Sequence, residues 1–111
     1  MVNLKTRGEH VNLNQLYYFK IIANSGSMVK AAHRLFISQS ALSKSLHDLE
    51  MNLGVELFER KGKRIFLNEY GEHLLIMVDE LLELAEKIKP NLEKLRDKNK
   101  NLLSIDSYYS F

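Results

Sequence analysis

The stretch from Phe36 to Gly54, FISQSALSKSLHDLEMNLG, constrains the fold most, because it predicts a single helix with two different faces. Ser38 is a good N-cap for this helix, and Gly54 can end it in the left-handed conformation. The apolar face consists of leucines that recur at steps of four, three and four residues: Leu42, Leu46, Leu49 and Leu53. Such a helix needs other helices packed behind its leucines.

The opposite face of this helix and its first turn carry short polar side chains and one cation. These residues are Gln39, Ser40, Ser43, Lys44 and His47. A glutamine can bond N6 and N7 of adenine, a serine can serve several bases, and a lysine reaches guanine or phosphate. The face therefore suits the major groove of double-stranded DNA. Many amphipathic helices simply turn a polar face to water, and this helix alone leaves both readings open.

Two shorter helices are predicted before the central one. Residues 12–24 read as a helix capped by Asn12, with Gln15 placed as in a capping box. Its expected buried stripe is Leu13, Leu16, Phe19 and Ala23. Residues 27–35 read as a second helix, in which Ala31 and Ala32 allow another helix to approach closely.

A tight turn, Phe36-Ile37, connects the second helix to the central helix. Two short helices joined in this way predict a helix-turn-helix, whose second helix enters the major groove while the first crosses the DNA backbone. Ser27, Lys30 and Arg34 are then candidate phosphate contacts. Each of them, taken singly, is also explained as solvated surface.

Residues 55–68, VELFERKGKRIFLN, predict a β-hairpin, because two short apolar segments flank a Lys-Gly-Lys turn. The expected tip carries four cations: Arg60, Lys61, Lys63 and Arg64. A charged tip often only keeps a sheet edge soluble. Beside a helix-turn-helix, it is better explained as a wing that lies along phosphates or in the minor groove.

A long helix is predicted from Asn68 onward, with Glu69 and Glu72 at its positive N-terminus. Its apolar residues form a heptad seam: Leu74, Val78, Leu81, Ala85, Ile88, Leu92 and Leu95. So small a domain cannot cover the whole seam, which predicts pairing with a second copy; folding back onto its own domain is the alternative. Pro90 predicts a kink or an early end of the helix.

The expected organisation has four parts. Residues 1–11 form a flexible arm, 12–68 the winged helix-turn-helix, 69–98 the linker and dimerisation helix, and 99–111 a tail. Residues 97–101 look like a polar linker, and residues 102–111 turn β-like, as at the start of a further domain. The fold class is therefore mainly α, with three helices and a β-hairpin wing before a long helix.

Several classes of function are disfavoured. The chain of 111 residues has a net charge of only +2, so the placement of charge matters more than its total. It has no cysteine, and its four histidines lack ligand spacing, so we expect no metal and no cofactor. No apolar run approaches the roughly 20 residues of a membrane span, which predicts a soluble cytoplasmic protein without a membrane partner.

An enzyme is also not expected. Ser43 and His47 share a helix face, and Asp48 follows His47, which superficially suggests a nucleophile and its base. Adjacent residues on a helix point about 100° apart, so Asp48 cannot readily orient His47. No phosphate-binding glycine loop is present either.

Four segments together, NLNQLYYF, GSMVKAAHRLFISQSALSKSLHDLE, LGVELFER and LNEYGEHLL, carry a family pattern. Over residues 12–75 the chain resembles the N-terminal DNA-binding domain of LysR-type transcriptional regulators. The resemblance implies a winged helix-turn-helix, a linker helix that dimerises, and a larger effector domain of which residues 102–106 are similar to the opening. It also implies that Gln39, Ser40, Ser43 and Lys44 contact bases and phosphates, although the family often has proline in place of Ser40.

The predicted function is sequence-specific binding of double-stranded DNA, as the DNA-binding module of a bacterial transcription regulator. A homodimer would read the two half-sites of an inverted-repeat operator. No small-molecule effector is expected for this part of the protein. The alternative is a truncated regulator that pairs with a full-length copy and inactivates it. The operator and the direction of regulation are not readable from these residues.

Overall fold

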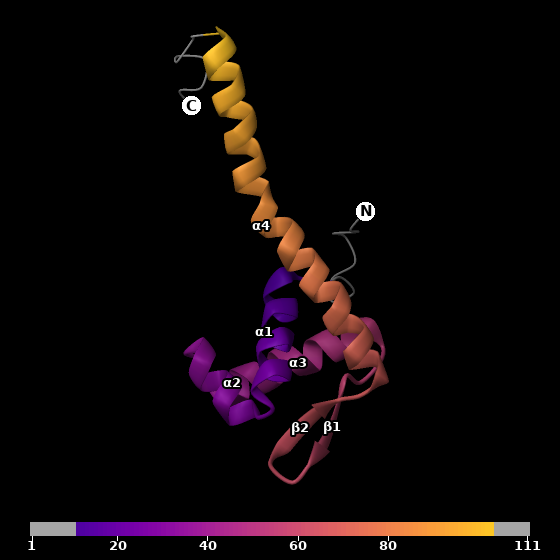
Figure 1. Ribbon diagram of the computed structural model, residues 1–111. Coiled ribbons are helices and arrows are strands. Elements are labelled where there is room, and N and C mark those ends of the chain that lie inside the picture. The colour runs from indigo at the N-terminus through magenta and orange to yellow at the C-terminus, as the bar shows by residue number, and fades with distance from the viewer. Residues whose placement is uncertain (1–10, 104–111) are drawn as a thin grey trace. The chain divides into compact units, whose positions relative to one another are not determined.

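Three short helices, a β-hairpin and one long helix follow each other along the chain in the computed structural model, which describes residues 11–103 (Figure 1). The helices and strands are α1 Leu13–Ser25, α2 Met28–Leu35, α3 Gln39–Leu53, β1 Phe58–Lys61, β2 Arg64–Leu67 and α4 Glu69–Leu103. The chain divides into two units, the first ending at Val78 and the second beginning at Asp79. The predicted mainly α fold with one hairpin is confirmed.

The ends of the first three helices follow from their capping residues. The Gln15 N–H donates to Asn12 Oδ1 (2.8 Å) and the Asn12 N–H donates to Gln15 Oε1 (3.2 Å), which completes the expected capping box. Ser27 and Ser38 cap α2 and α3, and Gly54 ends α3 with a φ of 76°. Each boundary lies within one residue of its predicted position.

The core of the first unit is formed by one face of each helix and the inner face of the hairpin. Leu42, Leu46 and Leu49 of α3 are buried, as predicted. The Phe19 and Phe58 rings lie 5.5 Å apart and join α1 to the hairpin. The remaining buried residues are Ile22, Met28, Ala31, Ala32, Leu57, Ile65 and Val78.

Two of the expected core residues are not buried. Leu13 is 62% exposed because it opens α1. Phe19, as predicted, and Ile22, which was not predicted, are buried deeper in the helix. Leu53 is 37% exposed, since it is the last residue of α3 before the chain turns at Gly54. Leu16 and Ala23 are half-buried.

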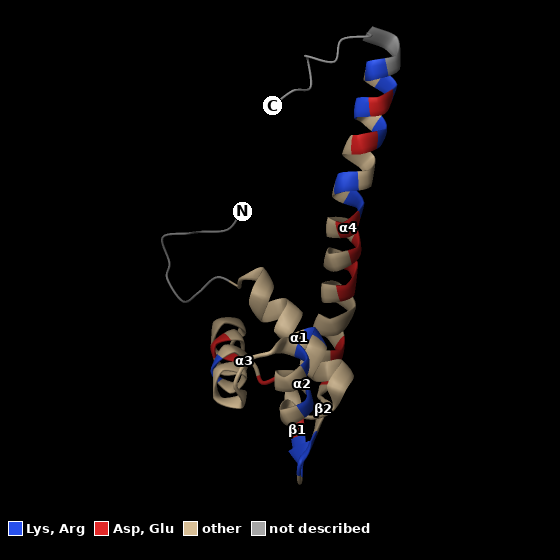
Figure 2. Ribbon diagram, turned by 90° about the vertical axis from the view of Figure 1, so that its left-hand side faces the viewer, with Lys and Arg blue, Asp and Glu red and all other residues tan. Residues whose placement is uncertain are grey.

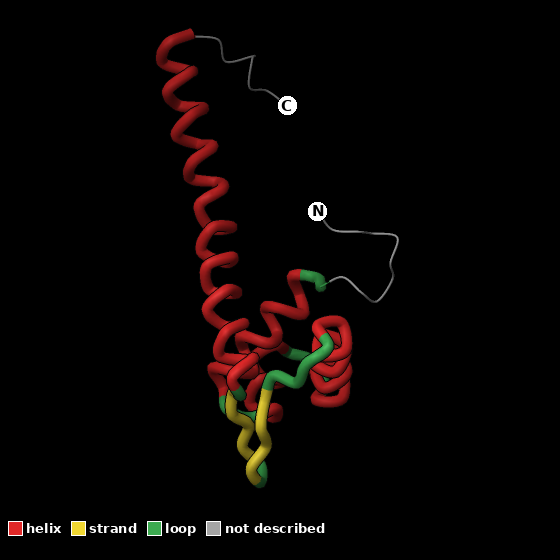
Figure 3. The backbone as a smooth tube through the Cα atoms, turned by 90° about the vertical axis from the view of Figure 1, so that its right-hand side faces the viewer, coloured by secondary structure: helices red, strands yellow, loops and turns green. Residues whose placement is uncertain are grey.

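The two strands of the hairpin run side by side (Figure 3). They are antiparallel, with Phe58 opposite Leu67 and Lys61 opposite Arg64. Two hydrogen bonds fix the hairpin to the helices. The Ile65 N–H donates to the Gly26 carbonyl (3.1 Å), and the Leu57 N–H donates to Glu50 Oε2 (2.8 Å). The hairpin is therefore held beside the turn that begins α2.

The start of α4 is packed closely onto the segment before β1. Asn68 Nδ2 donates to the Glu56 carbonyl, and Asn68 Oδ1 accepts from the Gly71 N–H, both at 2.8 Å. A Cβ at Gly71 would lie 2.2 Å from the carbonyl oxygen of Leu57, so only glycine fits without a shift of the backbone.

The long helix differs from its prediction at its C-terminal end. It continues through Pro90 to Leu103, so of the two outcomes expected at Pro90, a kink or an early end, the early end does not occur. A proline removes one backbone hydrogen bond, and the intact turns on both sides outweigh that loss. Residues 97–101, expected to be a linker, and residues 102–103, expected to be β-like, are helical. Residues 1–10 and 104–111, which include most of the predicted arm and tail, lie outside the described residues. Among the described helices, none is long and apolar enough to cross a membrane.

Candidate nucleic-acid interface

The polar edge of α3 lies on the surface of the first unit. Gln39, Ser40, Lys44 and His47 are exposed, and Ser43 is half-buried. The buried leucines on the other side of α3 fix which edge of the helix points outward. The structure therefore leaves all five predicted groove-reading residues at least partly accessible.

Two of these residues already have partners within α3. Lys44 Nζ lies 2.9 Å from Asp48 Oδ2, in an exposed ion pair one helical turn long. Ser40 Oγ lies 3.2 Å from Ser38 Oγ, and Ser38 Oγ also accepts from the Ala41 N–H. The partner of Lys44 was missed from the sequence, although a spacing of four residues is the usual signal of such a pair.

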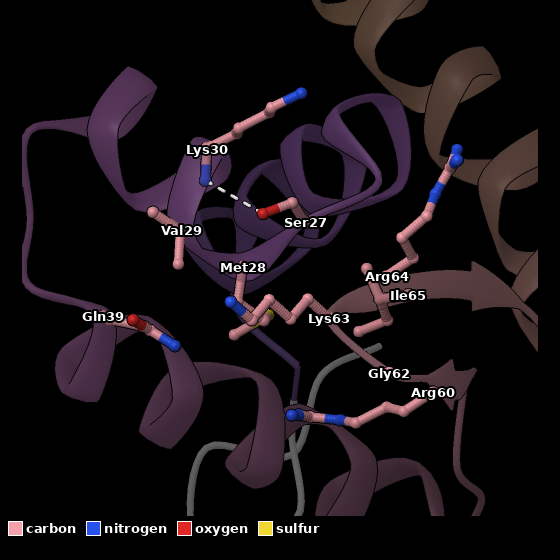
Figure 4. Close-up of a pocket in the computed structure, with 10 residues that line it drawn as sticks. All are labelled: Ser27, Met28, Val29, Lys30, Gln39, Arg60, Gly62, Lys63, Arg64 and Ile65. Atoms are coloured by element: carbon pink, nitrogen blue, oxygen red, sulfur yellow. Dashed lines mark hydrogen bonds between the residues drawn. The ribbon is translucent and has the colours of Figure 1, made fainter.

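The start of α2 presents backbone and cations together. Ser27 Oγ accepts from the Lys30 N–H (3.3 Å), so this hydroxyl caps the helix (Figure 4). Lys30 and Arg34 are exposed. Such a helix start favours phosphate binding, because the helix dipole and the neighbouring cations both attract an anion.

A surface hollow of about 590 Å³ lies between the start of α2, the start of α3 and the hairpin (Figure 4). We call it the cationic hollow, because its lining includes Lys30, Arg60, Lys63 and Arg64 and no acidic residue. Gln39, the first residue of α3, also lines it. The predicted phosphate contacts of α2 and the hairpin therefore line the same hollow as Gln39, whose amide can bond a base. Cations gathered in this way create a positive potential that attracts phosphates.

The hairpin cations lie on two different faces. Arg60 stands opposite the buried Ile65, and Lys61 stands opposite Arg64 on the other face. Lys61 Nζ is 6.0 Å and the Arg64 guanidinium carbon 5.4 Å from the ring centre of Phe66, which is 43% exposed. Figure 2 shows the cations gathered at the free end of the hairpin. The sequence interpretation treated Phe66 only as an apolar flank of the turn; alternation along β2 was the signal that it points outward.

The predicted seam of α4 is divided between two environments. Val78 is 1% exposed and belongs to the core of the first unit, so it is not available to a second copy; this part of the prediction is wrong. Leu74 is half-buried, and Leu81, Ala85, Ile88, Leu92 and Leu95 are exposed. Ile88, Leu92 and Leu95 border a shallow hollow of about 550 Å³ along the helix. Leu84, which was not predicted, is 63% exposed.

Comparisons with known proteins agree with this geometry. Residues 13–72 match the family of bacterial regulatory helix-turn-helix proteins, lysR family. The chain is 46% identical over 80 residues to the uncharacterized HTH-type transcriptional regulator YeiE of Escherichia coli (strain K12), covering 72% of this chain and 27% of YeiE. It is 41% identical over 86 residues to a probable RuBisCO transcriptional regulator of Cyanophora paradoxa, covering 78% of this chain and 26% of that protein. The chain thus spans about a quarter of the length of these relatives.

Solved structures that resemble the chain include two DNA complexes. The DNA-binding domain of CbnR bound to DNA is 34% identical, with a TM-score of 0.72 over 78% of this chain and 99% of that one. The BenM DNA-binding domain bound to benA site 1 DNA is 27% identical, with a TM-score of 0.72 over 77% of this chain and 99% of that one.

Proposed function

The chain belongs to the lysR family of bacterial regulatory helix-turn-helix proteins, and from that premise we propose that it binds a specific sequence of double-stranded DNA as part of a transcription regulator. The observation that carries the proposal is the cationic hollow, in which Gln39 lies among four cations from α2 and the hairpin. Phosphates bound by these cations would hold the backbone beside the start of α3. Base-reading side chains on α3 would then reach the major groove.

The proposed contacts divide into two kinds. Direct base readout falls to the exposed edge of α3: Gln39, Ser40, Ser43, Lys44 and His47. Phosphate binding falls to α2 and the hairpin: Ser27, Lys30, Arg34, Arg60, Lys61, Lys63 and Arg64. Since Asp48 pairs with Lys44 in the free protein, Lys44 would give up this exposed ion pair when it contacts a base.

A second copy of the chain is the proposed partner of α4. The exposed apolar residues from Leu81 to Leu95 need a cover, and an identical helix offers a matching stripe. Two joined copies would read two half-sites of an inverted repeat in the bacterial cytoplasm. In this proposal residues 12–68 bind DNA and the linker helix begins at Glu69.

The same exposed stripe supports a second candidate. Through this stripe, α4 would pair with the similar helix of another regulator and block the function of that regulator. A gel shift with and without a full-length relative separates the two. Binding of DNA by the chain alone supports the first, whereas no binding alone combined with mixed dimers supports the second.

Replacement of Gln39 tests base readout. Gln39→Ala should relax the preference at one operator position, with a loss of about 1–3 kcal/mol in discrimination, because a bidentate contact to adenine is removed. The measurement is selection of bound sequences from a random DNA pool, for the variant and the unaltered chain. Asn14→Ala removes an exposed amide from α1 and serves as the matched control. Equal preferences for Gln39→Ala and the unaltered chain would contradict the assignment.

Replacement of Lys63 tests phosphate binding by the hairpin. Lys63→Ala should weaken binding to all sequences alike and flatten the slope of log affinity against log salt by about 1, because one phosphate contact is lost. Titrations at several salt concentrations measure the slope. Lys94→Ala, on the exposed surface of α4, removes the same charge from a place that is not proposed to touch DNA. A slope unchanged by Lys63→Ala would remove this residue from the interface.

A further inference from the structure

Two cations and an aromatic ring lie on the outer face of the hairpin. The strand register places Lys61 directly opposite Arg64, and like charges at opposed positions of an antiparallel pair repel each other. Among the described residues, the structure records no ion pair for either side chain, although Glu59 lies on the same face. Within the described residues neither cation is ion-paired, so the counter-charge to both is left to a binding partner.

Phe66 lies beneath both cations. It stands opposite Glu59, on the face away from buried Phe58 and Ile65, and it is 43% exposed, so it is not needed to fill the core. A cation over an aromatic face is attracted by the ring, and an arginine can also stack on it. Lys61 Nζ lies 6.0 Å and the Arg64 guanidinium carbon 5.4 Å from the ring centre, so one aromatic side chain attracts both cations.

We propose that Lys61, Arg64 and Phe66 form a phosphate clamp, in which the Phe66 ring positions the two cations to hold one backbone phosphate of double-stranded DNA. A phosphate between them supplies the missing counter-charge. The guanidinium offers a planar pair of donors and the ammonium a point charge, which together suit a tetrahedral anion. The inference rests on the proposed DNA binding and names a positioning residue for it.

Duplex DNA is the occupant that the surroundings favour. Arg64 also lines the cationic hollow, so the clamp continues the surface on which Lys30, Arg60 and Lys63 lie. In Figure 4 the Arg64 guanidinium points away from Gln39, whereas Arg60 extends on the Gln39 side of the hairpin. A DNA backbone that lies along the hairpin therefore meets cations on both faces of the hairpin. The clamp adds a phosphate contact and does not involve the base-reading edge of α3.

The test compares Phe66→Leu, which keeps an apolar side chain without a π-face, with Phe66→Tyr, which keeps the ring. Affinity for a selected duplex and for an unrelated duplex is measured with the full chain. Phe66→Leu should weaken binding to both about two- to fivefold, which is the size of an exposed cation–π contact, and Phe66→Tyr should restore it. Base preference in a random pool should not change. Tyr70→Leu, which removes a 59% exposed aromatic ring outside the hairpin, is the control.

A double-mutant cycle shows whether Phe66 acts through the cations. In a chain with Lys61→Gln and Arg64→Gln, the further change Phe66→Leu should have no effect, because no cation is left to position. A full additional loss would overturn the clamp, and so would equal affinity of Phe66→Leu and the unaltered chain. Loss of base preference in Phe66→Leu would overturn it too, by making the ring a base contact. Failure of the unaltered chain to bind any duplex would overturn the proposed function and the clamp together, whereas normal binding by Phe66→Leu refutes the clamp alone.

Discussion

The two units of the chain differ in how far their apolar side chains are covered. The first unit ends at Val78, and the second begins at Asp79. In the first unit Phe19, Ile22, Leu42, Leu49 and Leu57 are each 1% exposed or less. In the second, the leucines and isoleucine at positions 84, 88 and 92 are 58–63% exposed. Both regions have apolar residues at helical spacing. An apolar helix face thus predicts burial against another surface, but it does not show whether that surface belongs to the same chain.

The largest expected effect contrasts one leucine from each region. Leu42→Ala should destabilise the first unit by about 2–5 kcal/mol, because burial is lost and a cavity remains. Leu92→Ala should leave that stability unchanged at concentrations too low for self-association, since the side chain is 61% exposed. Urea denaturation followed by circular dichroism measures both. A comparable loss for Leu92→Ala under these conditions would mean that α4 is covered by its own chain.

The second effect appears in association rather than in folding. Leu92→Lys should weaken self-association at least tenfold, because burying one leucine contributes about 1.5–3 kcal/mol per copy and a lysine cannot replace it. Sedimentation equilibrium measures the dissociation constant. Asn91→Lys adds the same charge at the neighbouring exposed position and should change association far less. If both variants behave alike, the apolar stripe is not the dimer interface.

The smallest effect concerns one of the exposed apolar residues of the first unit. Phe36 is 95% exposed and has a φ of 57°, a conformation that is strained for a bulky residue. Phe36→Gly should raise the free energy of unfolding by up to about 1 kcal/mol, since relief of strain exceeds the entropy lost by glycine on folding. Phe36→Ala keeps the strain and should bring no such gain. Thermal or urea unfolding decides, and a loss of stability in Phe36→Gly would show that the ring makes a stabilising contact.

Much of the candidate interface could be predicted because it depends on local sequence. Asn12, Ser27 and Ser38 can cap only where a helix begins, and Gly62 permits the positive φ of the hairpin turn. The polar edge of α3 follows from its leucines, since both are set by the same helical period. The resemblance to a known family added the roles of these residues, which propensity and periodicity alone left open.

Other features could not be predicted, since they depend on contacts between distant parts of the chain. The burial of Ile22 rather than Leu13 depends on which part of α1 packs against α2 and α3. Val78 is buried although its heptad position matches that of exposed Leu92. Gln39 and the hairpin cations line one hollow because the hydrogen bond from the Ile65 N–H to the Gly26 carbonyl holds the hairpin beside α2. The placement of Lys61 and Arg64 over Phe66 requires the strand register.

By itself, the sequence determined the three short helices, the hairpin and which side chains face outward on α3, because these depend on backbone preferences and spacing within a few residues. The tertiary structure alone decided which apolar residues are covered and which cations share a surface. Burial and proximity are properties of pairs of segments, and no single segment contains the information that specifies its neighbour.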